Sequence, residues 1–268
     1  MDLQLKGKRV LVTGSNSGIG AGTVKRMAEE GCIVVVHGRN AERASKVAAE
    51  ISKSGGKAYV AVGDISNDEG AAAVVKAVRD QMGEVDILVN NAGGSDDLSL
   101  SWSNTTPQTW IDAYQKNTIA PLRMIQAFLP DMRHSGWGRI IQVASTQATM
   151  PYAHTSPEYN SAKAGVITLT VSLAKTLART GITVNTVTPG PIDSPMEREF
   201  ILGLRPFKDM TFEEAEPLAA KKWNVSAGRL GRPDDLATAI TFLCSPLAGF
   251  ITGHNLRVDG GMSGFINA

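Results

Sequence analysis

VLVTGSNSGIG, residues 10–20, joins a short apolar run of β-forming residues to a turn that contains three glycines. A helical pattern follows at once and continues through Met27 to Gly31. Strand, glycine turn and helix in this order seat a phosphate group on a helix N-terminus, because glycines let backbone N–H groups approach an anion. The spacing Gly-x-x-x-Gly-x-Gly departs from the usual Gly-x-Gly-x-x-Gly, so the turn is weak evidence by itself.

Strands and helices continue to alternate along the chain. This alternation predicts right-handed β-α-β units and an α/β fold, in which helices cover both faces of a doubly wound parallel sheet of about seven strands. No linker or repeat interrupts it, so residues 1–268 are expected to form a single domain. The predicted strands are 10–12, 33–36, 58–62, 85–89, 139–143, 183–187 and 255–258, and the later helices are 41–54, 68–82, 107–134, 157–179 and 234–243.

Two segments break the alternation. Residues 94–106 are rich in Ser, Asp and Asn and contain Trp102, so they form either a solvated loop or, since they follow the carboxyl end of a strand, a substrate contact. Residues 191–228 hold several prolines and many bulky apolar side chains. We interpret the second segment as one or two short helices that form a substrate lid, with a plain surface excursion as the alternative.

The composition excludes several classes of protein. Lys and Arg total 27 against 26 for Asp and Glu, and this near-neutral balance gives no electrostatic case for nucleic acid or for an anionic membrane. Cys32 and Cys244 lie in apolar runs and are expected to be buried free thiols, and no metal-ligand spacing exists. The N-terminal residues show no signal peptide or membrane span. We therefore expect a cytosolic protein.

SPEYNSAKAG, residues 156–165, carries the chemistry. Ser156 is expected to cap a helix whose first turn holds Pro157, and Tyr159 and Lys163 then lie one turn apart on the same face. A phenol normally keeps its proton to about pH 10, but a neighbouring ammonium and the positive end of the helix dipole favour the phenolate. The alternative is an incidental surface pair, which is common on helices.

The helix predicted for residues 107–134 contains Pro121, four residues after Asn117. Proline has no N–H group, so the carbonyl of Asn117 loses its partner within the helix, and the helix should kink there. The freed carbonyl is able to hold a water molecule.

Six signals in order make the chain similar to the short-chain dehydrogenase/reductase family over nearly its whole length. They are Thr13 to Gly20, Asn90-Asn91-Ala92-Gly93, Asn117, Ser145, Tyr159-x-x-x-Lys163 and Pro189-Gly190. The resemblance implies a Rossmann-type fold and hydride transfer between a nicotinamide and a carbonyl or alcohol carbon.

The resemblance also assigns catalytic roles. Tyr159 would be the general acid or base, and Lys163 would lower the pKa of Tyr159 and bind the nicotinamide ribose. Ser145 would hold the substrate oxygen, and Asn117 would anchor a relay water. The link from Ser145 to Tyr159 is about one residue longer than usual in the family, so Thr146 stays open as an alternative to Ser145.

Cofactor contacts are implied in the same way. The glycine turn should seat the pyrophosphate, the residues after the third strand should flank the adenine, and those after the sixth should meet the nicotinamide amide. The implied residues are Gly14, Ser15, Asn16, Ser17, Gly18, Ile19, Gly20, Arg39, Asn40, Asp64, Ile65, Asn91, Ala92, Gly93, Tyr159, Lys163, Pro189, Gly190 and Ile192.

The choice between NADP(H) and NAD(H) depends on the end of the second strand. NAD enzymes commonly carry an acidic residue there, whereas this chain has Gly38 followed by Arg39. A guanidinium grips a 2′-phosphate with charge-assisted hydrogen bonds, so we predict NADP(H), with NAD(H) possible. The alternative is a solvated Arg39 that contacts no cofactor.

The substrate stays open between two groups. One is a free carbonyl or alcohol compound, indicated by Trp102, Met150, Tyr152, Phe207 and Trp223 near the expected cleft. The other is a 3-oxoacyl thioester on an acyl carrier protein, which would need a basic patch drawn from residues such as Arg133, His134, Arg139 and Arg179. A non-catalytic dinucleotide-binding protein is the third alternative. The family likeness also implies a homo-oligomer, most often a tetramer.

Overall fold

A seven-stranded parallel sheet forms the centre of the protein, in the order β3-β2-β1-β4-β5-β6-β7. The structure is a computed structural model and describes residues 1–95, 97, 99–152 and 156–264. The strands are β1 Arg9–Val12, β2 Ile33–Gly38, β3 Lys57–Val62, β4 Ile87–Asn90, β5 Gly138–Val143, β6 Ile182–Pro189 and β7 Asn255–Val258. The predicted doubly wound parallel sheet is confirmed.

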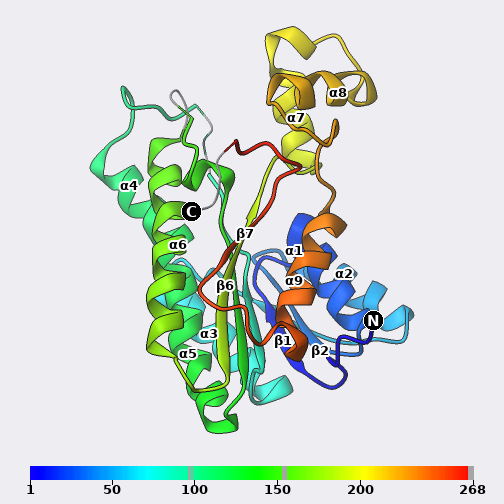
Figure 1. The fold of residues 1–268 in the computed structure, drawn as a ribbon, viewed down its shortest axis with the longest axis vertical. Helices are drawn as coiled ribbons and strands as arrows, with labels where there is room; N and C mark the ends of the chain where they lie inside the picture. The colour runs from blue at the N-terminus through cyan, green and yellow to red at the C-terminus, as the bar shows by residue number, and fades with distance from the viewer. Residues whose placement is uncertain (96, 98, 153–155, 265–268) are drawn as a thin grey trace.

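Helices cover both faces of the sheet (Figure 1). On one face lie α1 Gly18–Glu29, α2 Ala41–Lys53 and α9 Pro233–Cys244, and on the other α3 Asp68–Met82, α5 Ala120–Ser135 and α6 Pro157–Thr176. Side chains alternate between two buried cores, as they must along a pleated strand. In β1, for example, Val10 and Val12 belong to the core under α1 and α9, while Leu11 packs under α3 and α5.

The segment predicted as one helix over 107–134 is interrupted. It consists of α4 Pro107–Tyr114, a π-helical turn η1 Gln115–Ile119, and α5, in which Pro121 takes the second position. The expected irregularity lies just before Pro121, because the missing N–H group of a proline is best tolerated in the first turn of a helix. Asn117 sits in the middle of the π turn and is buried.

Two expectations for α6 need correction. Ser156 occupies the N-cap position, but its backbone is left-handed (φ 48°) and its side chain makes no capping hydrogen bond. The helix ends at Thr176 rather than at Arg179, because Arg179 and Gly181 both have positive φ and so cannot continue a right-handed helix. Pro157 does open the helix, as expected.

Residues 191–228 form the region above the sheet in Figure 1, beyond the carboxyl end of β6. They contain α7 Pro195–Gly203, a short 3-10 turn η3 Arg205–Phe207 and α8 Phe212–Lys222. These elements pack around their own apolar cluster, centred on Ile201 and Ala215. Met150 and Tyr152 from the body of the protein also pack against this cluster. The segment is therefore anchored beside the residues that follow β5.

None of the helices in the described part of the chain is both long enough and apolar enough to cross a membrane.

Candidate active site

Tyr159 and Ser145 meet at the carboxyl edge of the sheet. Ser145 follows β5 in extended conformation and begins the short 3-10 turn η2 Thr146–Ala148, where its Oγ accepts a hydrogen bond from the N–H of Gln147 (3.2 Å). Tyr159 lies in the first turn of α6, and its phenol is hydrogen-bonded to the Ser145 side chain. The hydroxyl groups of Tyr159 and Ser145 therefore lie together beyond the carboxyl end of β5.

Lys163 lies one turn further along α6 and is almost completely buried, with 4% of its surface exposed. Its ammonium donates to the carbonyl of Val143, the last residue of β5, at 2.8 Å. The Nζ atom is 5.9 Å from the centre of the Tyr159 ring. Burial, reinforced by the charge of Lys116, lowers the pKa of Lys163 to about 8. A buried amine of this kind exchanges its proton close to neutral pH.

Asn117 ties the π turn to the loop after β4. Its Oδ1 accepts from the N–H of Gly94 (2.8 Å), and its Nδ2 donates to the carbonyls of Gly94 (3.1 Å) and Ala113 (3.0 Å). A Cβ at Gly93 would lie 2.6 Å from this Oδ1 and 3.1 Å from Nζ of Lys163. Gly93 is therefore the point where the β4 loop, the π turn and α6 approach each other, and only a glycine fits there.

The expectation that an ammonium neighbour lowers the pKa of Tyr159 is wrong for this structure. Burial raises the pKa of the phenol above its ordinary value, and the charge of Glu197 raises it further, while the hydrogen bond with Ser145 opposes both. The ammonium of Lys163 is held by the Val143 carbonyl instead. The phenol consequently keeps its proton at neutral pH, which suits a proton donor.

The glycine turn is shaped to receive an anion. Gly14 and Gly18 have positive φ (65° and 54°), and beside Gly18 there is open space for at least 4 Å. A Cβ at Gly20 would collide with the carbonyl of Gly14 at 2.4 Å, so this glycine allows the turn to pack against the helix. Ser17 makes no side-chain cap and the first turn of α1 carries no acidic residue. The N–H groups of this helix end fit a pyrophosphate.

Thr13 and Asn91 hold this turn in place. The Oγ1 of Thr13 accepts from the N–H groups of Asn91 and Ala92, both at 3.0 Å, and Nδ2 of Asn91 donates to the carbonyls of Thr13 (2.9 Å) and Gly14 (3.2 Å). The Asn91 side chain, predicted as a cofactor contact, is thus used to join β4 to the glycine turn. Sequence reasoning placed Thr13 in the motif but gave it no role.

His37 also positions the glycine turn and was missed from the sequence. Burial lowers its pKa to about 4, so the imidazole is neutral. Its Nδ1 accepts from the N–H of Gly14 at 3.0 Å, which leaves Nε2 to donate to the carbonyl of Gly63 at 3.2 Å. Ser15 adds two further bonds, because its N–H donates to the His37 carbonyl and its Oγ accepts from the His37 N–H. The only sign of this role in the sequence is that His37 is a polar residue in an otherwise apolar strand.

Arg39 reaches into solvent at the end of β2. Its side chain is 68% exposed and lies 3.8 Å from the Asp64 carboxylate. Burial raises the pKa of Asp64, but hydrogen bonds from Ser66 and the charge of Arg39 outweigh it and hold the pKa below its usual value. Between the two loops, a Cβ at Gly38 would meet the Asn16 side chain at 2.4 Å. Arg39 is therefore free to turn towards a phosphate placed near Asn16.

Several predicted cofactor residues have other uses for their side chains. The Oδ1 of Asn40 caps α2 through the N–H of Arg43 (2.9 Å). The side chains of Ile65 and Ile192 are buried, each in one of the two cores that flank the sheet. Gly190, which follows Pro189, lies close to Asp259. A Cβ added at Gly190 would lie 2.9 Å from the Cα atom of Asp259.

The large side chains expected near the cleft pack mostly on protein. Phe207 is buried in the cluster of residues 191–228, and Trp223 stacks with Phe200 at 6.4 Å between ring centres. Trp102 is 71% exposed and contacts Trp110 (5.5 Å between centres).

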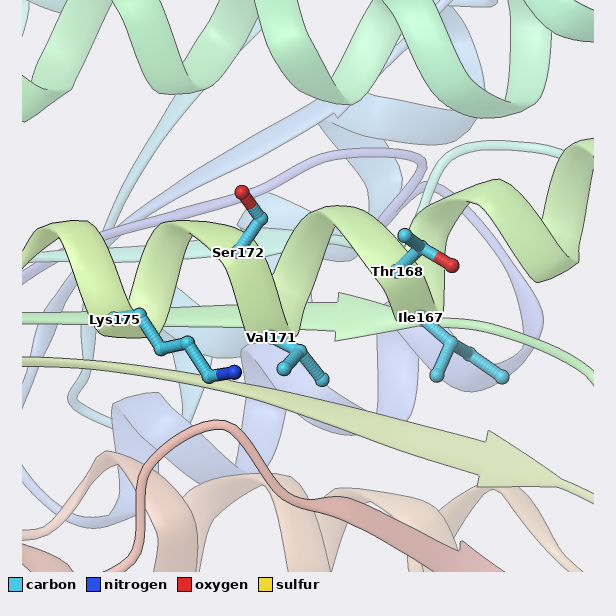
Figure 2. Close-up of a pocket in the computed structure, with 5 residues that line it drawn as sticks. All are labelled: Ile167, Thr168, Val171, Ser172 and Lys175. Atoms are coloured by element: carbon cyan, nitrogen blue, oxygen red, sulfur yellow. The ribbon is translucent and has the colours of Figure 1, made fainter.

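Two surface hollows lie outside the catalytic group. One of about 350 Å³ adjoins Gly18 between α1 and the start of α7. The other, of about 480 Å³, lies on the outer side of α6, where Ile167, Val171 and Lys175 project from one side of the helix (Figure 2). Neither hollow is lined by Tyr159 or Ser145.

The basic residues considered for carrier-protein docking are at the wrong edge of the sheet. Arg133 and His134 are in the last turn of α5, Arg139 is the second residue of β5, and Arg179 lies just before β6. All four are thus at the amino-terminal edge, opposite Ser145. Arg139 is also buried, donating to the carbonyls of Gly138, Gly181 and Ser245. These residues form no patch beside the cleft.

Comparison with known proteins identifies close relatives. The family model described as enoyl-(acyl carrier protein) reductase matches residues 14–263. The 3-oxoacyl-(acyl-carrier-protein) reductase FabG of Vibrio cholerae is 37% identical over 260 residues, covering 97% of this chain and 99% of the relative.

Solved structures of similar fold are also oxidoreductases. L-sorbose reductase of Gluconobacter frateurii, in complex with NADPH and L-sorbose, is 30% identical, with a TM-score of 0.93 over 99% of this chain and 100% of that one. A 7α-hydroxysteroid dehydrogenase with NADH is 31% identical, with a TM-score of 0.86 over 99% and 98%.

Proposed function

Since this chain belongs to the short-chain dehydrogenase/reductase family and is an oxidoreductase acting on CH–OH or carbonyl groups, we propose that it reduces a carbonyl group of a small molecule with NADPH. A nicotinamide cofactor, when bound, supplies the hydride. The residues of this chain bind and orient the carbonyl and deliver the proton. The observation that carries the proposal is the partly buried phenol of Tyr159, hydrogen-bonded to Ser145 and one turn from Lys163.

Each residue has a defined task in this mechanism. The Ser145 hydroxyl donates to the substrate oxygen and stabilises the negative charge that develops there. Tyr159 transfers its proton to the same oxygen, for which its raised pKa makes it ready at neutral pH. Lys163, with a pKa of about 8, is suited to restore that proton. Asn117 keeps the loop of Gly93 and Gly94 against Lys163.

Replacing Tyr159 by Phe tests the proposal. The variant lacks only the hydroxyl, so we expect kcat to fall by about 100- to 10,000-fold while NADPH binding, measured by fluorescence, is retained. Equal turnover by Tyr159→Phe and wild type would instead favour the non-catalytic dinucleotide-binding protein.

We propose NADP(H) as the preferred cofactor because Arg39 is exposed, adjoins the glycine turn and has only a long contact to Asp64. Removing its charge-assisted bonds by Arg39→Ala should raise the KM for NADPH about 10- to 100-fold and leave that for NADH unchanged. Equal use of the two cofactors by the wild-type enzyme would contradict this preference.

We propose a free small molecule as the substrate, covered by the lid at residues 191–228. The likeness to L-sorbose reductase supports this choice, as does the position of Arg133 and Arg139 away from the cleft. The second candidate, reduction of a 3-oxoacyl thioester on a carrier protein, is supported by the FabG relatives. Assays of acetoacetyl thioesters beside a panel of ketones separate the two, and turnover confined to thioesters would reverse our choice.

A homotetramer in the cytosol is the remaining proposal. The apolar side chains Ile167 and Val171 on the outer side of α6 (Figure 2) are suited to contact a second copy, since Val171 is 37% exposed. Light scattering measures the assembly, and a monomeric mass would contradict it.

A further inference from the structure

Glu197 is an acidic residue that the mechanism does not use. It lies in the first turn of α7, where its N–H donates to the Oγ of the capping residue Ser194 at 3.2 Å. Since α7 follows the carboxyl end of β6, the neighbour of β5, this turn lies on the same edge of the sheet as Ser145. The position brings a carboxyl group from the lid to the catalytic edge.

The face of α7 that carries Glu197 is the buried one. Ile201 lies one turn later on the same face and is completely buried in the cluster of residues 191–228, against which Tyr152 packs. The flanking residues Arg198 and Glu199 are exposed, and Arg198 pairs with Asp193. Glu197 is thus directed towards the body of the protein rather than towards bulk solvent.

The inner face of α7 packs towards Tyr152, which lies against the same apolar cluster as Ile201. Burial raises the pKa of both Tyr152 and Tyr159, and the charge of Glu197 raises each further. Burial also raises the pKa of Glu197 itself to about 7, with no cation opposing it. Within the residues that the structure describes, no side chain donates a hydrogen bond or forms an ion pair with this carboxyl group.

A partly buried carboxyl group without a donor is costly, and an apolar ligand would deepen that cost by removing the remaining water. A ligand hydroxyl would supply the missing donor. We propose that Glu197 is a specificity-determining residue, which accepts a hydrogen bond from a hydroxyl group on the carbon chain beside the reacting carbonyl. The substrate class is then hydroxylated ketones rather than unsubstituted aliphatic ketones, an inference that rests on the proposed reductase function.

A matched set of ketones tests this assignment. Butanone, hydroxybutanone and erythrulose share a carbon chain and differ in hydroxyl groups, and each is assayed with saturating NADPH. The wild-type enzyme should have the highest kcat/KM for erythrulose. In Glu197→Ala the ratio of kcat/KM for erythrulose to that for butanone should fall about 10- to 100-fold, the usual effect of deleting a hydrogen bond to a charged group.

Two further variants control for folding and for charge. Glu197→Gln keeps the side-chain volume and one acceptor oxygen, so it should fold like wild type and lose only part of the preference. Glu199→Gln removes a carboxyl group from the exposed side of the same helix and should leave the ratio unchanged. NADPH binding, followed by fluorescence, should be the same in all variants.

The outcomes separate the two proposals. If Glu197→Ala and Glu197→Gln reduce all three ketones with the wild-type ratio, the assignment of Glu197 is overturned and the reductase function stands. If wild-type enzyme reduces no ketone at all, the proposed function fails, and the inference about Glu197 falls with it.

Discussion

Replacing Glu197 by Gln should stabilise the free protein at alkaline pH and not at acidic pH. Burial raises the pKa of this carboxyl group from 4.5 to about 7, so the folded state holds the proton more tightly than the unfolded state does. The stability that this proton contributes is fully present below about pH 4.5 and is lost as the pH rises through about 7. Glutamine does not titrate and shows no such loss.

The size of this stability difference follows from the two pKa values of Glu197, 4.5 and about 7. At about 1.4 kcal/mol for each pH unit, the span between them corresponds to about 3 kcal/mol. Because part of the Glu197 side chain reaches solvent, we discount this to about 2 kcal/mol. For a chain of this length, that difference corresponds to about 4 to 8 °C in Tm.

Denaturant unfolding at about pH 5 and about pH 8 measures the effect, with all proteins at one concentration so that oligomerisation contributes equally. The difference in free energy of unfolding between Glu197→Gln and wild type should be larger at about pH 8 by about 2 kcal/mol. Glu199→Gln, on the exposed side of α7, should show the same difference at both pH values. A Glu197→Gln effect that does not change with pH would refute the reasoning.

Three further predictions concern the catalytic edge. Gly93→Ala places a Cβ 2.6 Å from Oδ1 of Asn117 and 3.1 Å from Nζ of Lys163, so kcat should fall about 100-fold with an unchanged circular dichroism spectrum; kcat within twofold of wild type would contradict the contact. Asn117→Ala removes three partly buried hydrogen bonds and should lower the free energy of unfolding by about 3 kcal/mol in urea, whereas a loss below about 1 kcal/mol would show that Asn117 does not hold the loop. Since the pKa of Lys163 is about 8, kcat/KM for reduction should decline above that pH, and Lys163→Arg should move the decline upward; an unmoved profile would assign it to another group.

The sheet was predictable because its strands are short runs rich in apolar and β-branched residues that alternate with helical segments. Runs such as residues 33–36 and 139–143 have to be buried on both faces, and only a parallel sheet between helices does this. Element ends were less certain, because Arg179 closes α6 through its own backbone conformation, which no side-chain pattern announces. The π turn at Asn117 was foreseen only as an irregularity near Pro121.

The positions of the candidate site residues were predictable where a motif contains them, but the contacts that surround each side chain were not. Tyr159, Lys163 and Ser145 were found by spacing and family likeness, and the structure places them together. The pKa of Tyr159 was predicted in the wrong direction, because helical spacing shows that Lys163 is near but not that burial and the charge of Glu197 raise the pKa of the phenol. The role of His37 depends on Gly14 and Gly63, which are distant in sequence.

Glu197 could not be identified from the sequence for two reasons: no motif contains it, and its burial depends on the tertiary structure. An acid on a nine-residue helix has no motif, and its burial becomes visible only when Ile201 and Tyr152 define the inner face of α7. In the free protein this acid weakens the fold at neutral pH, since its proton is released more readily in the unfolded chain. A hydroxyl group from a substrate would satisfy the carboxylate and recover that stability on binding. The same carboxyl group that destabilises the free protein is thus the one able to distinguish a hydroxylated ketone from an apolar one.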